Sequence, residues 1–182
     1  MNSKTVLDSE VTITELMIPS YANFGGKVHG GILLALMDKV AYVCASKYSG
    51  SYCVTVAVEG VEFLTPVEVG ELVSLKASVN YVGKTTMIVG IRVEALHPQS
   101  GVVKHTNSCY FTMAAKDDNG QLKEVPELVI QNELQLRRFC EGKAIRRLSL
   151  QKREYLKGNL KDVSVQEQMA MTINERVVVS LS

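Results

Sequence analysis

The chain has 182 residues, of which 46% are hydrophobic and 21% charged, and its formal net charge is +1. This length and composition are those of a single globular domain with a sizeable core and room for an appendage. The net charge gives no reason to expect a nucleic-acid partner, no apolar run approaches the roughly 18 residues of a membrane span, and residues 1–10 lack the apolar core of a signal peptide.

The N-terminal part predicts a strand, a loop and a helix. Residues 10–18 alternate polar and apolar side chains, which is typical of a strand. A glycine-rich loop over residues 23–31 follows, and residues 32–48 then contain neither glycine nor proline. Because this last stretch is almost entirely apolar, it predicts a helix that is buried all round. Asp38 lies in the middle of it, where a carboxylate must be paired, hydrogen-bonded or used.

The next segments predict a sheet. Four stretches are rich in valine and aromatic residues, as strands are: 52–64, 71–81, 85–96 and 102–116. Gly60, inside the first of them, predicts a bulge or a close backbone approach. Short links join the four strands, and such links favour an antiparallel meander. One helix against this sheet predicts an α+β domain over residues 1–126.

The character of the sequence changes after Pro126. Residues 131–156 place leucines among arginines and lysines and predict a basic amphipathic helix, so that residues 127–182 form a helical extension with a tail. The basic residues are interpreted either as a solvated face or as a surface for an anionic ligand or partner. The tail beyond Gly158 is either an added strand or disordered.

The cysteines predict free thiols. They are widely spaced, without a CxxC or any metal-ligand pattern, at Cys44, Cys53, Cys109 and Cys140. Their apolar neighbours are typical of thiols that pack as small hydrophobic groups. We therefore expect no metal site and a reducing, cytoplasmic compartment.

One constellation in this sequence suits acyl transfer. Free amides at a helix start, here at Gly30 and Gly31, stabilise negative charge that develops on an oxygen. Asn23 supplies a further donor, and Asp38 can act as nucleophile or as general base for water. Alternatively, the glycines only shape a turn and Asp38 pairs with a lysine such as Lys39.

Other nucleophile patterns are weaker. His29 either caps the loop or is a packed or exposed histidine, and the three histidines show neither triad nor metal spacing. The chain has no GxSxG elbow, which argues against a serine hydrolase.

The ordered set of motifs resembles the hotdog-fold acyl-CoA thioesterases, most of all the cytosolic acyl-CoA hydrolases. The set runs from Asn23 through Gly30-Gly31 to Asp38, and continues with VTVAVEG at residues 54–60, FL-x-P at 63–66 and GKTT at 83–86. This resemblance implies an antiparallel sheet wrapped around a long central helix. It also implies homodimers that pair edge to edge and assemble further into hexamers, as trimers of dimers.

The resemblance also implies roles for individual residues. It makes Asp38 the nucleophile or general base and Asn23 its helper, places the oxyanion amide at Gly30 or Gly31, and matches Thr55 to a hydroxyl that holds the water. The residues that we expect to bind coenzyme A are Gly83, Lys84, Thr85, Thr86, Lys104, Arg137 and Arg138. No metal or redox cofactor is implied, because coenzyme A is part of the substrate and of the product.

The expected active site is shared between two chains. Gly30 and Asp38 are eight residues apart, about 12 Å along one helix, which is too far for one carbonyl group to touch both. Two other functions remain open. One is a non-hydrolytic hotdog protein, either a module that binds acyl thioesters or a relative of the dehydratases, although Asp38 without a histidine in the helix argues against a dehydratase. The other is a structural or regulatory oligomer.

Overall fold

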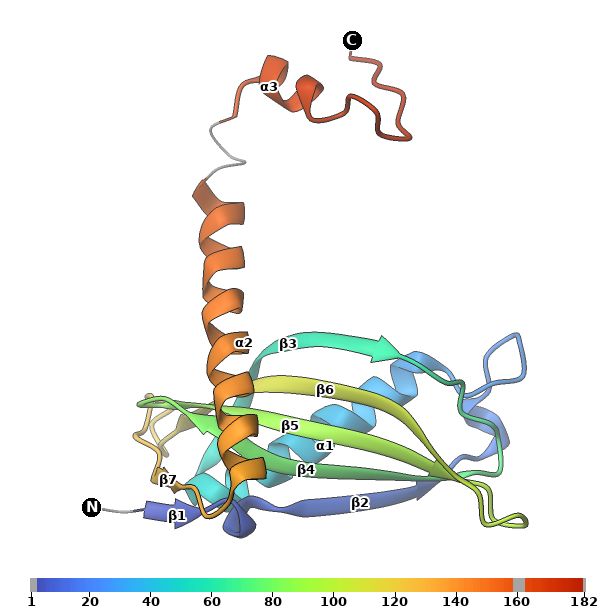
Figure 1. The fold of residues 1–182 in the computed structure, drawn as a ribbon, viewed down its shortest axis with the longest axis vertical. Coiled ribbons are helices and arrows are strands. Elements are labelled where there is room, and N and C mark those ends of the chain that lie inside the picture. Colours follow the sequence, from blue (N-terminus) through green and yellow to red (C-terminus); the bar gives the residue numbers. More distant parts are fainter. Residues whose placement is uncertain (1–2, 159–162, 182) are drawn as a thin grey trace. The chain divides into compact units, whose positions relative to one another are not determined.

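The computed structural model describes residues 3–158 and 163–181 (Figure 1). These residues fall into two compact units that divide after Arg146. The boundary expected at residue 126 lies inside the first unit, because the chain beyond it still pairs and packs with the main sheet region.

The first unit contains the five predicted strands as one antiparallel sheet. In their order across the sheet the strands are β2 (Val11–Leu16), β4 (Leu72–Val82), β5 (Thr86–Leu96), β6 (Val103–Lys116) and β3 (Tyr52–Phe63). The predicted helix is α1 (Gly30–Ser49), which lies along one face of this sheet (Figure 1). The α+β class and the expected sheet around a long helix are confirmed.

Helix α1 buries one face and exposes the other in this chain. Its buried side, which includes Leu33, Met37 and Val40, packs on apolar side chains of the sheet. Its other side exposes Tyr42, Val43 and Asp38. The expectation of a helix buried all round is therefore wrong for the single chain, because an apolar pattern does not tell packing on the chain's own sheet from packing on another copy.

The strand register shifts at four places in the described sheet, and Gly60 and Asn80 lie at two of these bulges. Gly60 has φ of +83°, and the register of β3 against β6 shifts between Val58 and Val61, as the glycine predicted. The second bulge, at Asn80 between Val79 and Tyr81 of β4, carries no glycine and was not predicted.

Two short strands were missed. β1 (Ser3–Thr5) pairs in parallel with β7 (Glu127–Val129). Three-residue strands are too short to show periodicity, and this pair depends on residues that are far apart in the sequence. Lys4 anchors the pair, since its ammonium group donates to the carbonyl oxygen of Tyr48 at the end of α1, at 2.7 Å. Short 3-10 turns lie at Leu7–Ser9 and Pro19–Tyr21.

The predicted C-terminal helix is α2 (Glu133–Gly158). Up to Arg146 it belongs to the first unit, where Phe139 packs on Tyr81 of β4 with ring centroids 5.2 Å apart. Gly142 permits this approach, because a Cβ atom there would lie 2.9 Å from the Tyr81 Cβ atom. The first turns of α2 thus lie on the sheet face opposite α1, as Figure 1 shows.

The second unit holds the rest of α2 and the short helix α3 (Val165–Ala170). Ser164 and Glu167 form a capping box at the start of α3. Residues 171–181 form no strand in the structure, so the added-strand alternative for the tail finds no support there. Within the described ranges, no helix has the length and hydropathy of a membrane-spanning segment.

Candidate functional site

The side chain of Asn23 holds the conformation of the glycine-rich loop. The Oδ1 atom of Asn23 accepts hydrogen bonds from the backbone amides of Gly25 at 2.8 Å and Lys27 at 3.2 Å. Gly26 completes the turn with φ of +75°. No acceptor for the Nδ2 group of Asn23 is present among the described residues, so that amide remains free to donate to a ligand. The side-chain donor expected of Asn23 is therefore available.

The start of α1 is capped by His29. Its Nδ1 atom accepts the amide hydrogen of Gly31 at 2.9 Å, and the side chain is also exposed, so His29 is both a cap and an exposed histidine. The Gly31 amide is therefore occupied. The amide of Gly30 has no acceptor in the described part of the chain, which favours Gly30 over Gly31 as the oxyanion donor.

This cap makes a testable contribution to stability. Replacing His29 with Ala removes the acceptor for the Gly31 amide and should lower the free energy of unfolding by about 1 kcal/mol. His29→Asn restores a good capping acceptor and should recover most of that loss. Urea unfolding at pH 7.5 measures both. Equal stabilities of the Ala and Asn variants would show that the cap contributes nothing.

Asp38 lies on the exposed side of α1 and faces β3. The hydroxyl of Thr55 donates to Asp38 Oδ1 at 2.6 Å, so the structure brings together two of the residues that the resemblance paired. Asp38 forms no ion pair with Lys39 or any other described residue. One hydrogen bond orients the carboxylate, which is open to solvent. The exposed side of α1 on which it lies also carries apolar side chains.

The loop and the carboxylate do not meet within one chain. Gly30 opens α1 and Asp38 lies eight residues later on the same helix, about 12 Å away at 1.5 Å per residue. The structure therefore forms two half-sites, the first made by Asn23 and Gly30 and the second by Asp38 and Thr55.

The residues expected to bind coenzyme A are scattered. Gly83, Lys84, Thr85 and Thr86 form the turn between β4 and β5, in which the Gly83 amide donates to the Thr86 carbonyl oxygen at 2.7 Å. Arg146 of α2 donates to the Thr86 hydroxyl at 3.0 Å. Sequence reasoning missed Arg146 as a member of this cluster, since only the packing of α2 brings it there.

The cations Lys84 and Lys104 cannot serve one phosphate group in one chain. Lys84 precedes β5 and pairs with Glu124, whereas Lys104 lies opposite Ala95 near the other end of β5. The length of this strand separates them by about 30 Å. The Lys104 ammonium also lies 2.9 Å from the buried Glu71 carboxylate, which accepts from the Glu68 amide, so this lysine holds a loop in place.

Arg137 and Arg138 lie on a third surface. They extend from α2 over the outer face of the sheet, the face opposite α1 and Asp38. The candidate cations therefore lie on separate surfaces of the single chain, and their roles toward coenzyme A stay predictions.

Two of the four thiols are buried and stay protonated, and the described residues contain no metal cluster. Burial raises the pKa of Cys44 and of Cys109 to about 12, so both remain protonated. Cys140 is exposed on α2, contrary to the expectation that all four thiols pack internally. Residues 3–158 and 163–181 contain no group of three or more His, Cys, Asp or Glu side chains arranged to hold a metal ion.

Comparisons with known proteins agree with this geometry. The family model of the thioesterase superfamily matches residues 25–102, which cover the loop from Gly25 onward, α1, Thr55 and the two following strands. Protein VdlD of Helicobacter pylori is 43% identical over 149 residues, which cover 82% of this chain and 84% of VdlD.

Two solved structures are also similar. An apo hexameric acyl-CoA thioesterase matches with a TM-score of 0.81 at 30% identity, over 84% of this chain and 97% of that one. An acyl-CoA hydrolase of Staphylococcus aureus, solved in complex with butyryl coenzyme A and coenzyme A, matches with a TM-score of 0.73 at 26% identity, over 85% and 99%. With this fold, these relatives and the matching family model, the chain belongs to the thioesterase superfamily and has its hotdog fold.

Proposed function

We propose that the protein is an acyl-CoA thioesterase, which hydrolyses acyl-CoA thioesters to a free carboxylic acid and coenzyme A. The observation that carries this proposal is the carboxylate of Asp38, exposed and held by the Thr55 hydroxyl at 2.6 Å in a helix that begins with a free amide. Membership of the thioesterase superfamily and the similarity to acyl-CoA thioesterases and hydrolases support it.

In the proposed reaction, the thioester carbonyl oxygen accepts hydrogen bonds from the Gly30 amide and the Asn23 Nδ2 group. These donors stabilise the negative charge that develops as the carbonyl carbon is attacked. Asp38 either attacks this carbon itself or takes a proton from the attacking water, and Thr55 orients the carboxylate. The carbon–sulfur bond then breaks, and coenzyme A leaves as a thiolate that takes up a proton. Where Asp38 is the nucleophile, the acyl group is left as an anhydride on its carboxylate, and a water molecule then hydrolyses this anhydride to release the carboxylic acid and restore Asp38.

We propose further that each active site is shared by two chains. All the reacting groups must lie about 3 Å from one carbonyl group, so the two half-sites of a single chain cannot act together. A two-fold axis solves this by bringing Asp38 and Thr55 of one copy to Asn23 and Gly30 of another. Each chain offers a surface for this contact with another copy. β3 is an edge strand, and apolar surface is exposed beside it by Val43, Val56 and Val58.

The assembly that we propose is a homodimer, and beyond it a trimer of dimers. The similar acyl-CoA thioesterase solved without ligand is itself hexameric. The proposed compartment is the cytoplasm, where free thiols such as those of Cys44 and Cys53 persist.

Variants of the S. aureus hydrolase have been made at three positions that show the same spacing. That hydrolase has also been solved with a single asparagine, aspartate or threonine replaced by alanine. The three positions follow one another at the same separations along its chain as Asn23, Asp38 and Thr55 do here.

For the coenzyme A moiety we propose the Gly83–Thr86 turn. Its backbone, the Thr86 hydroxyl and the Arg146 guanidinium group form one cluster, and arginine suits phosphate recognition. Lys84 lies at the same turn, where its exposed ammonium group pairs with Glu124 at 3.0 Å and would have to exchange this partner for a phosphate group.

A thiol-release assay tests the proposal. Purified protein is incubated with acetyl-, butyryl-, octanoyl- and palmitoyl-CoA, and free thiol is measured over time, with binding measured in parallel by calorimetry. Release of coenzyme A from at least one thioester, at a rate above that of buffer alone, is the expected result. Binding without release would favour the non-hydrolytic alternative, and neither binding nor release would leave a structural or regulatory oligomer.

A further inference from the structure

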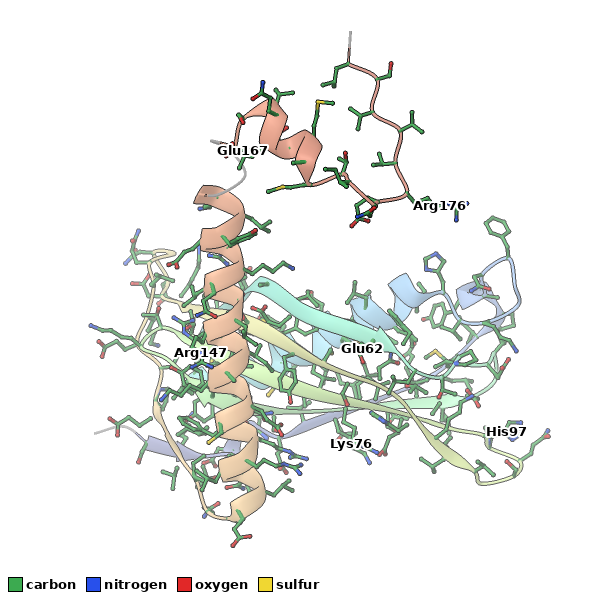
Figure 2. The ribbon with its side chains drawn as sticks, turned by 45° about the horizontal axis from the view of Figure 1, so that its top comes forward. Glu62, Lys76, His97, Arg147, Glu167 and Arg176 are labelled. Carbon is green, nitrogen blue, oxygen red and sulfur yellow. The ribbon has the colours of Figure 1, made fainter. Side chains whose placement is uncertain are left out.

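The end of strand β3 carries a phenylalanine that the proposed reaction does not use. Phe63 is the last residue of β3 and the first residue of the FL-x-P motif at residues 63–66. It is 54% exposed, although it follows two residues after Val61, which packs against the core. Side chains two residues apart lie on the same face of a strand, so Phe63 extends the inner face of β3 beyond the core. Glu62, the residue before it, is labelled in Figure 2.

The backbone on both sides of Phe63 is held by β6. Phe63 itself lies opposite Asn107, which is buried. The Nδ2 group of Asn107 donates to the Glu62 carbonyl oxygen at 2.9 Å. On the other side, the Leu64 amide donates to the Thr106 carbonyl oxygen at 3.0 Å. These bonds fix the point from which the aromatic ring extends, and side chains on fixed strands are well suited to shape a site.

The ring of Phe63 lies against the first residue of α1. A Cβ atom at Gly30 would stand 3.3 Å from the Cζ atom of Phe63, and 3.5 and 3.9 Å from its two Cε atoms. Gly30 is not among the glycines with positive φ, so its backbone conformation does not require a glycine. The missing side chain instead makes room for the tip of the ring beside the Gly30 amide. Figure 1 shows the end of β3 close to the start of α1.

Helix α1 and strand β3 touch at two places that mirror each other. Gly30 contacts Phe63 at one end. At the other end, eight residues away along each element, Asp38 accepts from Thr55. The helix and the strand therefore run in opposite directions. The two-fold axis that brings Asp38 and Thr55 of one copy to Gly30 of another also brings them to the Phe63 ring.

The turn proposed for coenzyme A determines on which side an acyl group would lie. A thioester carbonyl carbon bears the sulfur, which leads to coenzyme A, and the first carbon of the acyl chain. The Gly83–Thr86 turn ends at Thr86, which pairs with Ala114 of β6. Ala114 pairs in turn with Val54, the neighbour of Thr55. In a shared site this turn belongs to the chain that supplies Thr55, so the acyl carbon would lie toward Phe63 of the other chain.

From these contacts we infer that Phe63 is a specificity-determining residue, which lies against the first carbons of the acyl chain and selects straight, apolar acyl groups. The inference rests on the proposed function. An aromatic ring and an alkyl chain both leave water when they touch, which favours their contact. A branch beside the carbonyl group would collide with a ring that already lies so close to Gly30.

A carboxylate on the acyl chain would be disfavoured for a different reason. Against the Phe63 ring it would lose water without gaining a partner, and a charged group pays heavily for that loss. Lys27, the lysine of the glycine-rich loop, already pairs with Glu68 at 2.6 Å and is not free to receive the carboxylate. The Phe63 wall therefore distinguishes acyl groups by their shape and by their charge.

Three thioesters with four-carbon acyl groups test the inference. Butyryl-CoA is straight and apolar, isobutyryl-CoA carries a branch beside the carbonyl group, and succinyl-CoA ends in a carboxylate. The wild type should show a kcat/KM for butyryl-CoA at least about tenfold above that for either of the others, as small changes in an apolar pocket do. Thiol release measures all three, with the rate in buffer subtracted.

Two variants and a control assign this selectivity to the ring. Phe63→Ala removes the whole wall and should bring both ratios to within about threefold of one. Phe63→Leu keeps an apolar group without the flat ring, so it should narrow the ratio of butyryl-CoA to isobutyryl-CoA and keep the ratio to succinyl-CoA. Leu16, 50% exposed, lies on β2 at the opposite edge of the sheet from β3, so Leu16→Ala should leave both ratios as in the wild type.

A purely structural role of Phe63 predicts another result. The alanine variant would then lose kcat/KM for all three thioesters by one common factor, and unchanged ratios would overturn the inference. A wild type that does not discriminate among the three thioesters would overturn it as well. If the alanine variant does not fold, the ratio of butyryl-CoA to isobutyryl-CoA in the leucine variant decides.

Binding separates this inference from the proposed function. Calorimetry measures the affinity of the three thioesters for Asp38→Asn protein, with and without Phe63→Ala, in the absence of turnover. If the wild type releases no thiol but the affinity ratios depend on Phe63, the proposed function fails and the selectivity of Phe63 stands. If thiol is released and neither set of ratios responds to Phe63, the inference fails and the proposed function stands. Absence of both binding and release would overturn both.

Discussion

The Asp38→Asn variant is expected to hydrolyse acyl-CoA at least about a hundredfold more slowly than the wild type, with the loss in kcat. The asparagine is almost the same size and its Oδ1 atom can still accept the Thr55 hydroxyl, so the fold and the local geometry should remain. At neutral pH an amide can act neither as nucleophile nor as base. Steady-state kinetics with the best substrate of the thiol-release panel measure the effect.

A matched substitution controls for the chemistry of the change. Asp118 is exposed in the turn after β6 and forms no side-chain hydrogen bond within the described residues, so Asp118→Asn should leave kcat unchanged. The catalytic role of Asp38 would be refuted if its asparagine variant kept wild-type turnover and an unchanged melting temperature.

The second large effect is expected at Asn23, where the two ends of one side chain have separate roles. Asn23→Asp keeps an acceptor for the amides of Gly25 and Lys27, so the loop should keep its shape. It replaces the Nδ2 donor with a negatively charged oxygen at the point where the oxyanion develops. Losing one such donor costs about a hundred- to a thousandfold in kcat, and the added charge should push the effect to the upper end.

The comparison with Asn23→Ala separates shape from catalysis. The alanine variant loses both the donor and the acceptor that folds the loop, so it should lose activity and also some stability, measured by urea unfolding. If the aspartate variant were fully active while the alanine variant was not, Asn23 would only shape the loop.

Regular periodicity made most of the fold predictable from the sequence. Strand alternation, a long stretch without glycine or proline, and turn residues located α1 and the five main strands to within about two residues. The bulge at Gly60 was predictable because a glycine inside a strand signals one. The bulge at Asn80 was not, because the asparagine fits an ordinary strand pattern and only the register against β5 reveals the extra residue.

The sequence names the residues of the proposed site but does not predict their geometry. The motif named Asn23, Gly30, Gly31, Asp38 and Thr55, whereas the choice of Gly30 over Gly31 depends on the His29 ring, whose orientation no pattern gives. The sequence likewise did not predict that one side of α1 is exposed. Apolar side chains give the same sequence pattern whether they pack on the chain's own sheet or on another copy.

The positions of the candidate cations were predictable only in part. Lys84 precedes the predicted strand 85–96 and Lys104 lies near the start of the next strand, so the length of the first strand already places them at opposite ends of the sheet. The topology could therefore have separated them before the structure was known. The position of Arg137 and Arg138 on the face away from Asp38 depends instead on the packing of α2 through Phe139 and Gly142, which is a long-range property.

The central claim, that two chains build each active site, is tested most directly by mixing two inactive variants. Asn23→Asp and Asp38→Asn chains with different affinity tags are co-expressed, and tandem purification shows that mixed assemblies form. Random pairing makes about half of the dimers mixed, and each mixed dimer holds one intact site and one that is doubly damaged. The shared site predicts that hydrolysis returns to about a quarter of the wild-type rate. If mixed assemblies form and activity stays at the level of the single variants, Asp38 works with groups of its own chain and the shared site is wrong.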